Sequence, residues 1–89
     1  MKAVITVIGK DTVGILAKVS AQCAKYNVNI CDVSQSILDG MFCMMMICDI
    51  SAINADFVKF ADDTKAMGKE IGMQIHVMHS DIFDSMHRI

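Results

Sequence analysis

The hydrophobic residues of this sequence follow two different periods along the chain. Residues 2–8 are apolar at almost every position, so a strand there has two apolar faces and is expected inside a sheet. From about Thr12 to Asn27, apolar side chains return every three or four residues, as on one face of a helix. These side chains are Ile15, Leu16, Val19, Cys23 and Tyr26. Asp11 or Thr12 is placed to cap the first turn of this helix.

A hairpin is predicted in the middle of the chain. Residues 30–38 and 41–50 are extended patterns, and Asp39-Gly40 between them is a strong signal for a two-residue turn. Along the second of these strands, successive side chains point to opposite faces. One face carries Phe42, Met44, Met46 and Cys48, and the other carries Met41, Cys43, Met45 and Ile47.

A second helix and a fourth strand complete the pattern. We expect Ser51 to cap the helix and Gly72 to end it. Its apolar positions are Ile53, Phe57, Phe60, Thr64, Met67 and Ile71. Residues 73–78 form the predicted strand, and the tail from Asp81 has the spacing of a short docked helical turn. In that tail Ile82, Phe83, Met86 and Ile89 recur at helical spacing.

The predicted order is strand, helix, strand, strand, helix, strand. This is the α+β ferredoxin-like βαββαβ sandwich, in which two helices cover one face of a four-stranded antiparallel sheet. We expect one domain over residues 1–89, with 80–89 as a C-terminal tail. The uncovered face of the sheet would expose apolar side chains in a monomer, and such patches usually mark an interface. The sequence therefore predicts a homo-oligomer, most simply a two-fold dimer.

Composition excludes several classes of partner. The chain has 89 residues and a formal net charge of -2, which gives no basic field for nucleic acid. No apolar run approaches the roughly 20 residues that cross a bilayer, so we expect a cytoplasmic protein without a membrane partner. The cysteines form no C-x-x-C pair and lie in apolar patterns, as buried reduced thiols do, so no disulfide framework is expected. They are Cys23, Cys31, Cys43 and Cys48.

The turn Gly9-Lys10-Asp11-Thr12-Val13-Gly14, between the first strand and the first helix, is the candidate functional segment. The first backbone N–H groups of a helix lack internal partners and carry the positive end of its dipole. Glycine lets a ligand approach such groups closely, so this turn is suited to a small anionic group. A purely structural reading stays open, in which Gly9 and Gly14 only permit tight packing and Asp11 only caps.

Catalytic, nucleotide and metal chemistry find no support. Gly9 and Gly14 have nucleotide-loop spacing, but Ile15 and Leu16 follow where Lys and Ser or Thr are needed. An acylphosphatase needs an arginine in the first turn, and the only arginine is Arg88.

Metal ligands are also scattered. The first loop lacks the cysteine pair of copper-chaperone modules, and alternation along 41–50 separates its Cys and Met side chains. His76 and His79 are expected on opposite faces, and His87 lies in the tail. We expect no enzyme activity, no cofactor and no metal.

Three segments of the chain match a known family. They are Ala3-Val4-Ile5-Thr6-Val7-Ile8-Gly9, the turn Lys10-Asp11-Thr12-Val13-Gly14-Ile15, and Asn27-Val28-Asn29-Ile30-Cys31-Asp32. Essentially the whole chain resembles an ACT domain, a small regulatory module that binds amino acids in many relatives, and it is most similar to versions that consist of one such domain. The resemblance implies an effector site at a dimer interface, between the turn after strand one and the start of strand two of a neighbouring subunit.

Carried onto this sequence, the resemblance points to Asp11, Gly14 and Ile15, with Asn29 and Ile30 facing them. The amides near Gly14 and Ile15 would hold the carboxylate of an amino acid, and Asp11 or Asn29 would accept from its ammonium group. If Asp11 also caps the helix, it competes with the ligand for the same donors. The expected function is a non-catalytic sensor that acts on a regulated protein. The alternative is a ligand-independent interaction module that uses its apolar sheet face or its strand edges.

Overall fold

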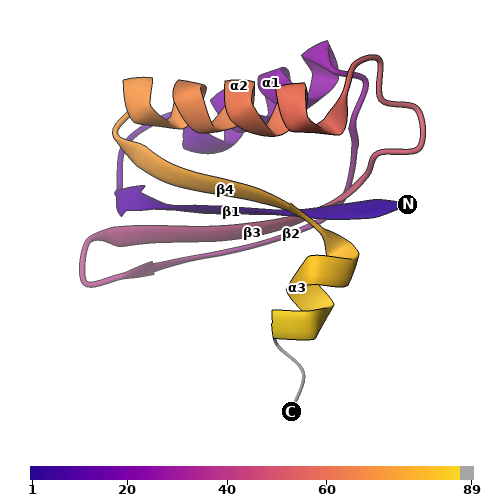
Figure 1. Cartoon of the computed structure of the whole chain (residues 1–89). Coiled ribbons are helices and arrows are strands. Elements are labelled where there is room, and N and C mark those ends of the chain that lie inside the picture. The colour runs from indigo at the N-terminus through magenta and orange to yellow at the C-terminus, as the bar shows by residue number, and fades with distance from the viewer. Residues whose placement is uncertain (87–89) are drawn as a thin grey trace.

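The computed structural model describes residues 1–86 and shows a four-stranded sheet between helices (Figure 1). The elements in chain order are β1 (Lys2–Lys10), α1 (Ile15–Lys25), β2 (Asn29–Leu38), β3 (Met41–Asp49), α2 (Phe57–Glu70), β4 (Met73–His79) and α3 (Ser80–Met86). The sheet is antiparallel throughout, in the order β2-β3-β1-β4. The ferredoxin-like fold and the central place of β1 are confirmed. His87, Arg88 and Ile89 of the predicted tail lie outside the described residues.

The core lies between the sheet and the pair α1 and α2, which both cover the same face (Figure 1). Alternation explains which strand residues enter it, because every second side chain points toward the helices. Those fully or almost fully buried from β1 and β3 are Ala3, Ile5, Val7, Phe42, Met44, Met46 and Cys48. The helices contribute Ile15, Val19, Cys23, Phe60 and Thr64. The two predicted apolar stripes therefore face the sheet except at two positions: Leu16 is 40% exposed, and Ile53 lies in the loop before α2.

Helix α1 begins at Ile15, and neither Asp11 nor Thr12 caps it. Gly14 is the residue at the N-cap, with φ 85° and ψ 13°, and no side chain bonds to the helix start. The left-handed backbone at Gly14 turns the chain into the helix only after this residue, so side chains at 11 and 12 are not in a capping position. The predicted cap was wrong.

Helix α2 begins at Phe57, later than predicted, with Asp56 at its N-cap and no side-chain cap. Ser51 instead belongs to the loop after β3. Its hydroxyl accepts a hydrogen bond from the Met1 amino group at 3.2 Å, and its amide donates to the Asp49 carboxylate at 2.8 Å. Ser51 is therefore used in a turn that joins the chain start to the end of β3.

The predicted turns are confirmed by their backbone angles. Asp39 and Gly40 have φ values of 54° and 76°, so both central residues of the β2–β3 turn are left-handed, as a tight hairpin requires. Gly72 has φ 74° and follows Ile71, the C-cap of α2, where a residue without Cβ ends the helix at little cost.

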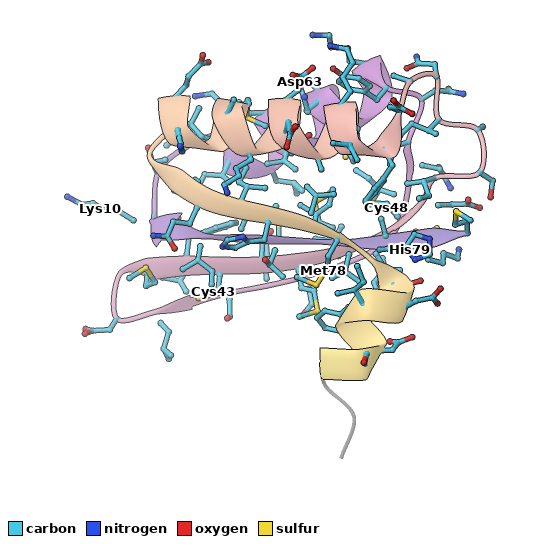
Figure 2. All side chains as sticks on the ribbon, in the orientation of Figure 1. Lys10, Cys43, Cys48, Asp63, Met78 and His79 are labelled. Atoms are coloured by element: carbon cyan, nitrogen blue, oxygen red, sulfur yellow. The ribbon has the colours of Figure 1, made fainter. Side chains whose placement is uncertain are left out.

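The face of the sheet opposite α1 and α2 is covered at one end only. Helix α3 packs there against β1 and β4, and Val4 on this face is only 2% exposed (Figure 1). At the other end Ile8, Met41 and Met45 are 44%, 45% and 37% exposed. The predicted exposed apolar face is therefore confirmed for the half that α3 leaves open. In Figure 2, Met78 lies beside α3 and Cys43 lies away from it.

The four cysteines are all free thiols. Cys23 and Cys48 are buried, as predicted, and a hydrogen bond between them together with burial raises the pKa of Cys48. Cys43 is half-buried and Cys31 is exposed, so the prediction of buried thiols was wrong for Cys31. Within residues 1–86, every helix is too short or too polar to span a bilayer.

Candidate functional site

The turn between β1 and α1 projects into solvent. Residues 11–14 are all exposed, and Val13 is 93% exposed. The Asp11 amide donates a hydrogen bond to the Gly40 carbonyl at 3.1 Å, which fixes the turn against the β2–β3 hairpin. The turn is thus held at its first residue and accessible over the rest of its length.

The start of α1 presents backbone donors without a side-chain cap. The Lys18 amide donates to the Gly14 carbonyl at 3.0 Å. The amides of Ile15, Leu16 and Ala17 come before it in the first turn, where backbone amides have no acceptor within the helix. The first turn of α1 contains no acidic residue. Because Asp11 does not cap the helix, the predicted competition between Asp11 and an anionic ligand for these amides does not arise. The Ile15 side chain is buried, so this residue offers its backbone rather than its side chain.

The two glycines of the turn have different roles. A Cβ at Gly9 would lie 2.6 Å from Met73 Sδ and 2.8 Å from the Gly72 carbonyl oxygen, so Gly9 is required for packing between β1 and the start of β4. Gly14 has positive φ, and apart from its two chain neighbours no residue has an atom within 4 Å of its Cβ position. The structural reading therefore holds for Gly9. At Gly14 the space in front of the helix start is open.

Asn29 and Ile30 lie at the opposite end of the sheet from this turn. Asn29 pairs with Asp49, which pairs with Lys2 at the start of β1, whereas Asp11 follows the last residue of β1. The length of β1 separates the two groups by roughly 26 Å, at about 3.3 Å per residue. Within one chain, Asp11, Gly14 and Ile15 thus follow the end of β1 at one end of the sheet, and Asn29 and Ile30 lie at the other end.

The surroundings of Asn29 include groups that the sequence pattern did not reveal. A hollow of about 300 Å³ is lined by Ala24, Asn27, Val28, Asn29 and Ala52. Beside it the register of β2 against β3 shifts between Ile30 and Asp32, which makes Cys31 a bulge. Lys2 Nζ lies 3.3 Å from Cys31 Sγ, and this hydrogen bond raises the pKa of Lys2. Alternation alone gives no sign of a bulge, so the Lys2–Cys31 pair was missed.

The two histidines of β4 lie on opposite faces of the sheet. His76 pairs with Thr6 on the face away from α1 and α2, whereas His79 pairs with Ala3 and places its ring 6.2 Å from that of Phe57. Their predicted placement on opposite faces is confirmed. The described part of the chain contains no group of three His, Cys, Asp or Glu side chains arranged to hold a metal ion.

Comparison with known proteins agrees with this architecture. The UPF0237 protein of Listeria innocua is 49% identical over 89 residues, which is 100% of both chains. The structure of an ACT domain protein from Streptococcus pneumoniae superposes with a TM-score of 0.82 at 39% identity, over 94% of each chain. The ligand-free regulatory subunit of aspartate kinase from Thermus thermophilus shares the fold, with a TM-score of 0.65 and 24% identity over 88% of this chain and 50% of that one.

The family assignment rests on the region that forms the sheet and its two covering helices. The family model described as ACT domain matches residues 2–78. This range starts at the first residue of β1 and stops one residue before the end of β4, so it does not include α3. Together with the whole-length relatives, this match shows that the chain belongs to the ACT domain family.

Proposed function

We propose that this chain is a non-catalytic sensor that binds an amino acid between two copies of itself. The observation that carries the proposal is the exposed start of α1, where Gly14 has an open Cβ position and no side chain or acid occupies the amide donors. A free amino acid has a carboxylate that needs such donors. Charge-assisted hydrogen bonds of about 1.5–3 kcal/mol each are sufficient for affinity near the millimolar range.

The ammonium group of the ligand needs acceptors, and these come from two places. Asp11 belongs to the turn that leads into α1 of the same chain, and it is exposed. The Asn29 side-chain oxygen is the second candidate acceptor, and it must come from a neighbouring copy because it lies at the other end of its own sheet. The complete site therefore requires a dimer.

The free edge of β2 offers a way to build that dimer. Within residues 1–86, β2 is an edge strand that pairs only with β3, and nearly all of its residues are exposed. Two-fold antiparallel pairing of β2 with a second β2 places Asn29 of one copy opposite Leu38 of the other. Leu38 precedes the β2–β3 turn, and the Gly40 carbonyl of that turn bonds the Asp11 amide. Such pairing would bring the start of one β2 toward the candidate turn of the other.

A second candidate function rests on the uncovered half of the sheet face. Ile8, Met41 and Met45 there are exposed, as in a surface for ligand-independent association. In that case the domain would assemble through this face, and the start of α1 would have no ligand.

Thermal-shift measurements with a panel of amino acids separate the two functions. Sensing predicts stabilisation by a specific amino acid, and its loss in Asp11→Ala and in Gly14→Val. Asp62→Ala is the control for the first variant, since Asp62 is exposed on α2. Gly72→Val is the control for the second, because Gly72 also combines positive φ with an open Cβ position. A flat response of the wild-type chain to every amino acid would favour the ligand-independent module.

A further inference from the structure

The outer side of β4 borders a groove that neither proposed function uses. β4 is the second edge strand of the sheet, and α2 runs along it (Figure 1). A hollow of about 350 Å³ at this edge is lined by Lys65 and Lys69 of α2 and by Met73, Gln74, Ile75 and His76 of β4. Edge strands have backbone N–H and C=O groups without partners on their outer side. The groove thus combines free backbone groups with side chains from α2.

Close packing at Gly68 brings the lysines to this edge. A Cβ at Gly68 would lie 2.6 Å from Ile75 Cγ1, so α2 approaches β4 more closely than a helix with a side chain at this position allows. Lys65 and Lys69 come one turn before Gly68 and directly after it. Their aliphatic stems therefore start close to the strand edge, with their ammonium groups free to reach past it.

The groove is basic and contains no acid of its own. Among the side chains of residues 1–86, Lys59 contacts Asp63 and His79 contacts Asp81, and neither pair involves Lys65 or Lys69. β4 itself has the sequence MQIHVMH, without a carboxylate. Glu70 lines a different hollow, together with Asp63, on the side of α2 toward α1. Asp62, one turn before Lys65, is the acid of α2 on the same helix face as the two lysines.

We propose that an extended acidic segment of a partner protein adds to β4 as a fifth strand. Its backbone would bond to the free edge of β4, and its carboxylates, at every second residue, would meet Lys65 and Lys69. A second copy of this chain is the poorer occupant, because two-fold pairing of β4 strands would bring both lysine pairs into the same groove. β2 has one charged residue, Asp32, and suits self-association better. This inference does not depend on amino-acid binding.

The test uses the full chain and a fluorescein-labelled peptide of alternating Glu and Val, followed by fluorescence anisotropy at low ionic strength. We expect saturable binding that weakens with added salt, as screening of exposed charges requires. Lys65→Gln/Lys69→Gln should weaken it about tenfold. The matched control is Lys10→Gln/Lys18→Gln, which removes the same charge from exposed sites outside the groove and should change binding less than about twofold.

A second peptide distinguishes strand addition from charge attraction alone. The same sequence N-methylated at alternate residues keeps its carboxylates but cannot donate hydrogen bonds along one edge. We expect it to bind at least about tenfold more weakly than the parent peptide. The proposal is overturned if both peptides bind equally, if the control variant weakens binding as much as the groove variant, or if the parent peptide shows no saturable binding. None of these outcomes bears on the amino-acid response of the start of α1.

Discussion

The hydroxyl group of Tyr26, at the end of α1, donates a hydrogen bond to the carboxylate of Asp63 on α2. Figure 2 shows Asp63 on the helical layer above the sheet. The Tyr26 ring is buried and packs edge-to-face on Phe60, with centroids 5.3 Å apart. Lys59 Nζ lies 3.3 Å from the same carboxylate oxygen. This contact joins the two helices that cover the sheet.

The Tyr26–Asp63 contact predicts a pH-dependent loss of stability. The hydrogen bond from Tyr26, followed by that from Lys59, lowers the pKa of Asp63. A carboxyl group whose pKa is lower in the folded state stabilises the fold at pH values above its unfolded-state pKa of about 3.9. This stabilisation is lost as the pH falls through the lower folded-state pKa. Asp63→Asn should therefore lower Tm at neutral pH, and its difference from wild type should shrink below about pH 3.9. Asp62→Asn is the control, and an equal pH profile for both variants would contradict the prediction.

The contact between Gly68 and Ile75 predicts that an added methyl group destabilises the fold. Gly68→Ala gains about 1 kcal/mol of helix propensity but forces a Cβ into buried side-chain atoms, which costs about 1–3 kcal/mol. We expect a net loss of stability in urea unfolding followed by circular dichroism. In an Ile75→Ala background the same substitution should become neutral or stabilising, because the obstructing atoms are gone. Equal effects in both backgrounds would mean that the contact does not limit the approach of α2 to β4.

Two inactive variants should complement each other if the site is shared between chains. Asp11→Ala and Asn29→Ala each damage both sites of a homodimer. A mixed dimer retains one intact site, so an equal mixture should recover about a quarter of the wild-type binding capacity after subunit exchange. Isothermal titration with the amino acid found in the thermal-shift panel measures this recovery. Should the mixture stay as inactive as its components, Asp11 and Asn29 do not act at one site.

The proposed edge-to-edge dimer predicts which surface tolerates charge. Ser34→Lys places like charges at the centre of both paired β2 strands, and we expect it to dissociate the dimer in light scattering. Met45→Lys places the same charge on the uncovered sheet face and should leave an edge-paired dimer intact. The reverse outcome would indicate association through the sheet face and would favour the ligand-independent module.

The parts of the fold that depend on neighbouring residues were predictable from the sequence. The parts that depend on contacts between residues distant in the sequence were not. The Asp39-Gly40 turn and the helix stop at Gly72 follow from neighbouring residues alone, and both were found. Ser51 was predicted to cap α2 because serine is a favoured N-cap residue. Contacts with residues distant in the sequence instead fix the conformation of the loop after β3, so that α2 begins later. Asn54 donates from its backbone to the Tyr26 carbonyl at 3.1 Å, and Asn27 Nδ2 donates to the Ala52 carbonyl at 2.8 Å.

The candidate site was predictable only in part for the same reason. Gly14 was identified as a residue that keeps the helix start accessible, and its left-handed backbone explains why no side chain caps α1. The bulge at Cys31 and the groove beside β4 depend on strand register and on how closely α2 approaches the sheet. Neither feature changes the spacing of hydrophobic residues in the sequence, so the sequence alone did not predict them.

The placement of Gly14 and Asn29 at opposite ends of β1 has a consequence for how such a sensor would respond. In the proposed assembly an isolated chain holds two half-sites and no whole one, so ligand binding and self-association reinforce each other. Dilution would then silence the sensor even when the metabolite is abundant. The cell could set its threshold through the amount of protein it makes as well as through the amount of ligand present.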